Sequence, residues 1–184
     1  MDPITWLIII IVALIVVVAL MYNNLVVMKN RINNAWAQID VQLKRRADLI
    51  PNLVETVKGY MKHEKSVLEN VTKARSAIMS AKGPKESAAA EGMLAGALKT
   101  LFAVAESYPN LKANENFMML QEELSGTESK IAYARQLYND SVLVFNQTIQ
   151  QIPWNLLAGP LGFKEREYFK AEETERKAVK VKFD

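Results

Sequence analysis

Apolar residues form one unbroken run near the start of the chain and a periodic pattern over most of the rest. Positions 4–21 contain no charged residue and are almost entirely aliphatic. The hydrocarbon core of a bilayer is about 30 Å thick and needs roughly 20 apolar helical residues to cross it. Within lipid, a lone segment satisfies its backbone hydrogen bonds only as a helix. The run therefore predicts a transmembrane anchor, residues 1–21, in front of a soluble domain.

A cleaved signal peptide is the alternative interpretation of this run. It would carry a basic segment before a shorter apolar stretch and would end at a small-residue cleavage site. Neither feature is present around positions 4–21, so the sequence favours a retained anchor. Lys and Arg follow the span but do not precede it, and such residues tend to stay in the cytoplasm. We expect a single-pass protein of the cytoplasmic membrane, with its N-terminus outside and its domain in the cytoplasm.

After residue 22 the apolar positions recur at steps of three and four, the spacing of an amphipathic helix. Gly and Pro are scarce and separate the periodic segments, so they mark the ends of elements. The pattern predicts an all-α domain over residues 22–152, folded as an antiparallel up-and-down bundle of long helices. Residues 153–184 follow as an apolar loop and a charged, extended C-terminal tail. The expected helices cover residues 22–46, 48–80, 84–107 and 113–151.

The stretch around Pro51 allows two interpretations. In one, a single helix continues through Pro51 with a kink, which would leave three helices. In the other, a helix ends at the cations of residues 44–46, Asp48 caps a new helix, and Pro51 lies in its first turn. The second gives helices of similar length, so we expect the chain to reverse at residues 47–50 and form four helices. Four alternating helices bring Ile152 back to the membrane.

An apolar segment that contains Gly and Pro, residues 153–163, follows the last helix. Two roles are open for it: a loop that closes the end of the bundle, or one that dips into the membrane interface, which Trp favours. Farther on, residues 177–183 alternate Lys with Val and Phe, a pattern typical of an edge strand that could pair with a neighbouring subunit. A disordered terminus is the alternative interpretation of this tail. The candidate membrane-interface residues are Trp154, Leu156, Leu157 and Phe163.

Residue types that carry catalysis are scarce in this chain. It has no cysteine and one histidine, His63, which lacks the second histidine of a zinc-protease helix. This composition argues against a transition-metal site, and no serine lies in a nucleophile-elbow pattern. The net charge of +3 is too small to indicate nucleic acid. We therefore expect no enzyme, no catalytic or metal-binding residues, no cofactor and no nucleic-acid partner.

Two polar clusters stand out on the expected helices. One covers residues 40–52, where charged side chains gather beside a proline. The other lies on the last helix, where Asn139 and Asn146 are seven residues apart and so share nearly one face. Amides on a helix stripe either fix register by hydrogen bonds across helices or contact a partner, and both roles remain open. The candidate structural or partner-contact residues are Asp40, Arg45, Arg46, Asp48, Pro51, Asn52, Tyr138, Asn139 and Asn146.

Several segments of the chain also match a known pattern. They are residues 26–30, 35–46, 48–60, 134–135, 138–140 and 162–163, together with Asn146. Over nearly its whole length, anchor included, the sequence resembles the LemA family. Ala47 stands where the family pattern leads us to expect a histidine after the paired arginines, so a histidine cannot be essential at that position here.

The resemblance implies a prokaryotic cytoplasmic-membrane protein with a helical-bundle domain and no established catalytic activity. Family genes often neighbour those of membrane zinc proteases, and a related protein works in building magnetosome membranes. The leading hypothesis is a non-enzymatic scaffold that self-assembles at the cytoplasmic membrane, with membrane lipid and further copies of the chain as its partners. The alternative is an adaptor or regulator of a membrane-embedded zinc protease.

Overall fold

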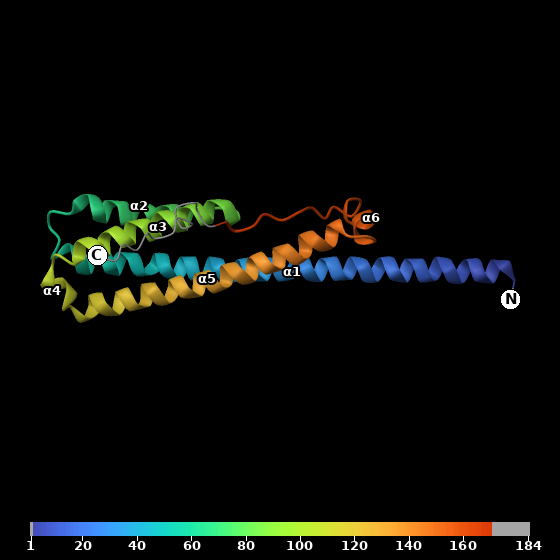
Figure 1. Cartoon of the computed structure of the whole chain (residues 1–184), viewed down its shortest axis with the longest axis horizontal. Helices are drawn as coiled ribbons and strands as arrows, with labels where there is room; N and C mark the ends of the chain where they lie inside the picture. Colours follow the sequence, from blue (N-terminus) through green and yellow to red (C-terminus); the bar gives the residue numbers. More distant parts are fainter. Residues whose placement is uncertain (1, 171–184) are drawn as a thin grey trace, which may run out of the picture.

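The computed structural model describes residues 2–170, which form helices joined by short connections (Figure 1). Within these residues there is no strand, and the expected all-α fold is confirmed. The predicted strand-like tail, residues 177–183, lies outside the described residues. The helices are α1 (Pro3–Lys58), α2 (Lys65–Ser80), α3 (Gly83–Ala105), α4 (Pro109–Lys112), α5 (Glu115–Gln150) and α6 (Trp154–Ala158).

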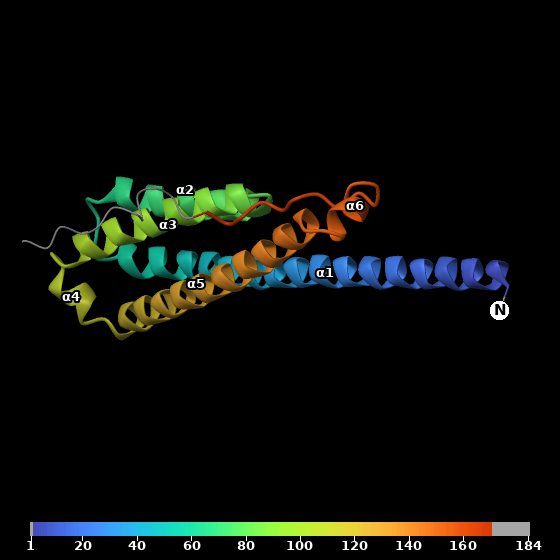
Figure 2. The same cartoon turned by 45° about the vertical axis from the view of Figure 1, so that its right-hand side comes forward.

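The longer helices alternate in direction, and α1 with α5 forms the central antiparallel pair (Figures 1 and 2). From the far end of α1, α2 runs back toward the N-terminal run, α3 runs away again, and α5 returns beside α1. The α2–α3 hairpin covers only the part of the pair that is remote from the N-terminal run. We call this part the distal half, and the part nearer the run the proximal half. In the proximal half, α6 and the extended residues 164–170 take the place of the hairpin.

The N-terminal run stands apart from the bundle as a lone helical extension (Figure 1). Among residues 2–170, two helices are long and apolar enough to cross a membrane, but 39% of the apolar window in α3 is buried in the bundle, against 6% of the window in α1. Burial of the α1 stripe begins at Met21 and Leu25, where the run ends. The exposed run therefore indicates a single-pass membrane anchor, whereas α3 is a core helix.

The predicted reversal at residues 47–50 is wrong, because α1 continues through Pro51 to Lys58. Proline has no N–H, so the carbonyl of Ala47, four residues earlier, loses its helical partner. Arg75 of α2 replaces it, donating from Nε to the Ala47 oxygen at 3.0 Å. Asp48 is consequently an exposed residue inside the helix and caps nothing.

The chain reverses instead at residues 59–64, beyond the end of α1. Met61 is buried there and joins the core, which holds the turn against the bundle. Four longer helices therefore still form, α1, α2, α3 and α5. As expected, the last of them runs back toward the N-terminal run (Figure 1). Helix α5 begins at Glu115, two residues after the expected start at residue 113, because Asn114 caps it by accepting the N–H of Phe117 at 3.0 Å.

Candidate functional site

Two asparagines on α5 hold the extended residues 164–170, which we call the C-terminal segment. Asn146 donates from Nδ2 to the Arg166 carbonyl at 2.9 Å and accepts the Arg166 N–H at 2.8 Å. Two turns earlier, Asn139 makes the same pair of bonds with Phe169, at 3.0 and 2.9 Å. Each amide thus satisfies both main-chain groups of one residue, as a neighbouring β-strand would. The asparagines share one face, as predicted, but their partner is an extended chain and not another helix.

The spacing of the asparagines matches the geometry of the segment that they hold. Seven helical residues, from Asn139 to Asn146, advance about 10.5 Å along α5. Three extended residues, from Arg166 to Phe169, advance about 10 Å. The C-terminal segment runs antiparallel to α5, so both amides meet the main chain in register. A helical segment would advance less than half as far over three residues and could not make both contacts.

An aromatic anchor completes this site. Phe169 is 1% exposed and lies against the ring of Trp36 on α1, with the centroids 6.3 Å apart. Trp36 in turn meets Tyr138 edge-on at 5.7 Å. The Tyr138 hydroxyl donates to the Glu167 carbonyl at 2.8 Å, and burial raises the pKa of this phenol above its ordinary value of 10.0. We call the surface formed by Trp36, Tyr138, Asn139 and Asn146 the segment site.

The four predicted membrane-interface residues lie at the proximal end of the bundle, around α6. Phe163 is half-buried, and its ring packs edge-on against those of Tyr22 on α1 and Phe145 on α5. The distances between ring centroids are 5.9 Å and 6.4 Å, respectively. Trp154 and Leu157 are also half-buried, whereas Leu156 is 69% exposed. Residues 153–163 therefore close the end of the bundle with part of their apolar surface. They expose the rest at the level of α1 where the N-terminal run ends.

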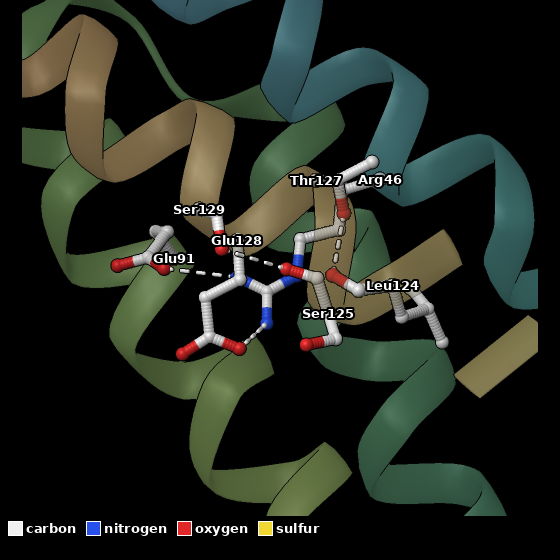
Figure 3. A network of polar contacts seen from close by, with 7 residues as sticks. All are labelled: Arg46, Glu91, Leu124, Ser125, Thr127, Glu128 and Ser129. Atoms are coloured by element: carbon white, nitrogen blue, oxygen red, sulfur yellow. Dashed lines mark hydrogen bonds and ion pairs between the residues drawn. The ribbon is translucent and has the colours of Figure 1, made fainter. Parts of the chain in front are cut away.

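The first predicted polar cluster contributes one buried residue to the distal half, Arg46 of α1. Its side chain is 2% exposed and forms ion pairs with Glu91 of α3 at 3.0 Å and Glu128 of α5 at 3.3 Å (Figure 3). This guanidinium joins three helices, because two carboxylates from different elements meet one planar cation. The Glu91 side chain is 7% exposed and that of Glu128 64%, so the contact with Glu91 is the one shielded from water.

The structure does not bring the rest of that predicted cluster into one site. Asp40 pairs with Lys44 one turn away, at 2.7 Å, on the surface of α1. Such exposed pairs contribute about 0.3–0.5 kcal/mol to a helix. The exposed members of the cluster are Arg45, Asp48, Pro51 and Asn52.

Sequence reasoning missed Glu91 and Arg75. Glu91 follows a run of alanines and lies on the buried stripe of α3 with Ser87, Leu94 and Leu98, three or four residues apart. A lone carboxylate in that position signals a buried cation elsewhere in the chain, and could have been found. Nothing local to Arg75 shows that its partner is a carbonyl next to a proline on another helix.

A shallow apolar groove also runs between α1 and α5, with a volume of about 680 Å³. Val41 and Tyr133 stand in it with 59% and 71% of their surface exposed. Ala37 of α1 and Gly126 of α5 are small residues in its lining. Across residues 2–170, no three His, Asp or Glu side chains gather where they could hold a metal ion. The buried Arg46 pair and the asparagine contacts described above join different segments of the chain.

Comparisons with known proteins agree on one family. The sequence model of the LemA family matches residues 35–183. Magnetosome protein MamQ 2 of Paramagnetospirillum magneticum is 28% identical over 176 residues, and MamQ of Magnetospirillum gryphiswaldense 26% over 176, each match covering 82% of this chain and 65% of the relative. Protein LemA of Metamycoplasma hominis is 29% identical over 158 residues, 84% of this chain and 71% of that protein. The chain thus spans less than two thirds of the length of the magnetosome relatives.

Proposed function

Because this chain belongs to the LemA family, we propose that it is a non-enzymatic scaffold that self-assembles at the cytoplasmic membrane, with its helical domain in the cytoplasm. One observation carries the proposal: membrane anchor and domain share one uninterrupted helix, Pro3–Lys58. The alternative, an adaptor or regulator of a membrane zinc protease, rests on the family resemblance alone.

The shared helix joins anchor and bundle as one stiff body. From Tyr22 to Lys58 it extends about 55 Å at 1.5 Å per residue. Its junction with the span is braced, since Met21 and Leu25 are buried against the bundle. Every copy in one membrane would therefore hold its domain at the same height and tilt. Fixed presentation suits side-by-side assembly, whereas a protein that must search for distant substrates gains from a flexible linker.

The groove between α1 and α5 offers a surface for such assembly. Val41 and Tyr133 are large side chains that the bundle leaves in water, on the two helices that define the direction of the domain. Burying a side chain of this size contributes about 1.5–3 kcal/mol. Contact between copies along this face would keep their anchors parallel, as one bilayer requires.

The mass of the detergent-extracted full chain, measured by light scattering, tests the proposal. We expect a discrete species several times the 20.7 kDa of one chain. A monomer would contradict self-assembly, and a monomer that co-purifies with a membrane zinc protease would support the adaptor alternative.

A pair of matched insertions between Asn23 and Asn24 tests the role of stiffness. Seven Ala-rich residues add nearly two helical turns and preserve both the helix and its rotational phase. Seven Gly and Ser residues give a flexible joint of the same length. We expect the helical insertion to retain the assembled mass and the flexible one to lower it. Equal masses would show that the continuous helix is irrelevant to assembly.

Orientation can be tested by labelling, because the chain contains no cysteine. His63 lies on the exposed connection between α1 and α2, far from the span, so His63→Cys introduces one reactive thiol. A membrane-impermeant maleimide should label it only after the cells are permeabilised. Labelling of intact cells would place the domain outside.

A further inference from the structure

We propose that the segment site is a peptide-binding surface which, in the assembled protein, is filled by the C-terminal segment of a second copy. The proposal rests on the proposed self-assembly and supplies a contact for it. Its basis is the way in which Asn139, Asn146, Tyr138 and Trp36 hold residues 164–170.

The polar side chains of the segment site form hydrogen bonds with the main chain of the C-terminal segment and not with its side chains. The asparagines donate two hydrogen bonds to the carbonyls of Arg166 and Phe169 and accept two from the N–H groups of the same residues. Tyr138 donates a fifth bond to the carbonyl of Glu167. Phe169 is the anchor that is buried among side chains. Recognition of this kind requires an extended peptide with one aromatic residue in register with Asn139, as in other sites that bind peptides by backbone pairing. The same segment of another copy meets each of these requirements with identical contacts.

The connection to the C-terminal segment allows such an exchange. Residues 159–165 join α6 to the first held residue, and fully extended they span about 23 Å. This is about two helix diameters, enough to reach α5 of an adjacent copy. Gly159 and Gly162 lie in this connection, and Gly162 has a φ of +76° that other residues rarely adopt. Glycines of this kind absorb the backbone rotation that redirects a segment. The exchange separates Phe163 from Tyr22 and Phe145. These two ring contacts therefore favour the state in which each copy binds its own segment.

The membrane anchor places the copy that provides the segment and the copy that binds it at the same height above the bilayer. Trp36 lies 15 residues beyond Met21 on the unbroken α1, about 22 Å from the end of the run. Copies in one bilayer share this height and direction. A segment that leaves α6 of one copy therefore meets the segment site of its neighbour without a change of level. The contact is head-to-tail and can close into a ring.

Two full-length variants test the exchange. One can only provide its C-terminal segment to another copy, and the other can only bind such a segment. In the donor variant, Asn139→Ala and Asn146→Ala disable the site and leave the segment intact. In the acceptor variant, Phe169→Ala removes the anchor and leaves the site intact. With different affinity tags and co-reconstitution in one liposome, we expect the donor to capture the acceptor at least tenfold more than either variant captures itself. Equal capture in the mixed and unmixed samples would overturn the exchange. Circular dichroism verifies that both variants keep their helical content.

A peptide measurement distinguishes the site from the exchange. A fluorescent peptide of residues 164–170 should bind the acceptor variant, as measured by anisotropy, at least tenfold more tightly than the same peptide with Phe169→Ala. Wild-type chain should bind it weakly, because an intact tethered segment, from the same copy or from a neighbour, occupies the site at a high effective concentration. No binding to the acceptor variant would overturn the peptide site itself.

The proposed function and this inference can fail separately. If wild-type chain assembles but donor and acceptor do not capture each other, assembly rests on another surface and the exchange is wrong. If wild-type chain is monomeric although the acceptor binds the peptide, self-assembly is wrong and the segment acts within one copy.

Discussion

The two halves of the α1–α5 pair are covered by different chemistry. In the distal half, helices α2 and α3 pack over the pair, and a buried arginine meets carboxylates from two elements. In the proximal half, an extended segment covers the pair, and neutral side-chain amides meet main-chain groups. A buried charge needs one specific partner, because an unpaired charge is costly to desolvate. A main-chain group is the same in every residue. The distal half therefore specifies which helices meet, whereas the proximal half specifies a conformation and one aromatic anchor.

The largest expected effect is in the distal half. Arg46→Ala removes the cation from a carboxylate, Glu91, that remains buried, and breaking such a pair costs about 3–5 kcal/mol. Arg45→Ala, next to it but exposed, should change the free energy of unfolding by no more than about 0.5 kcal/mol. Urea unfolding of the detergent-solubilised chain measures both. Equal losses would show that burial of Arg46 contributes nothing. Replacing Arg46 with Met and Glu91 with Leu together should restore much of the stability.

The amides of the proximal half should give smaller and local effects. Asn139→Ala and Asn146→Ala each leave a main-chain N–H and carbonyl without their partner, which costs about 1–3 kcal/mol. We expect faster hydrogen exchange at the amides of Arg166 and Phe169 and unchanged exchange in α2 and α3. Asn52→Ala, on the exposed face of α1, is the matched control. Equally fast exchange in the distal helices would show that the two halves unfold as one unit.

The proline in α1 offers a test of coupling within the distal half. Arg75→Met leaves the buried Ala47 carbonyl without its donor and should cost about 1–3 kcal/mol. In a Pro51→Ala background the cost should fall, because residue 51 then supplies an N–H to that carbonyl. A double-mutant cycle over the four proteins measures the difference. Additive effects would show that Arg75 does not compensate for Pro51. Lys73→Met on the exposed face of α2 is the control.

The smallest expected effect concerns pH in the proximal half. Burial raises the pKa of Tyr138, so the folded state holds this proton more tightly than a state with the segment detached. The stabilisation is complete below pH 10, the ordinary pKa of the phenol, and is lost as the pH rises through the raised value. Tyr138→Phe removes this dependence and one hydrogen bond, about 0.5–1.5 kcal/mol.

Trp36 reports this change, since it contacts both Tyr138 and Phe169. With Trp6 and Trp154 replaced by Phe, its fluorescence should shift above pH 10 in the chain that keeps Tyr138 and remain constant in Tyr138→Phe. Tyr133→Phe, which alters an exposed phenol, should keep the shift. A shift that persists in Tyr138→Phe would assign the alkaline change to other groups.

Local patterns in the sequence determined the anchor, the helical class and the shared face of Asn139 and Asn146. An unbroken apolar run and a three-to-four spacing report a helix and its buried stripe through neighbours on the same element. The start of α5 was expected within two residues of its position, although its capping residue, Asn114, was identified only in the structure.

The tertiary structure decided what those residues meet. Pro51 was expected near a helix break because its missing N–H is a local fact, whereas Arg75, which satisfies the freed carbonyl, lies on another helix 28 residues along the chain from Ala47. The asparagines were expected to meet another helix or a partner protein, and they meet a segment whose sequence carries no periodic signal. Because every residue carries main-chain groups, the residue types of a segment do not indicate that its main chain will be bound by side-chain amides. Only the packing of α1 against α5, with the return of the chain past α6, brings that segment to the amides.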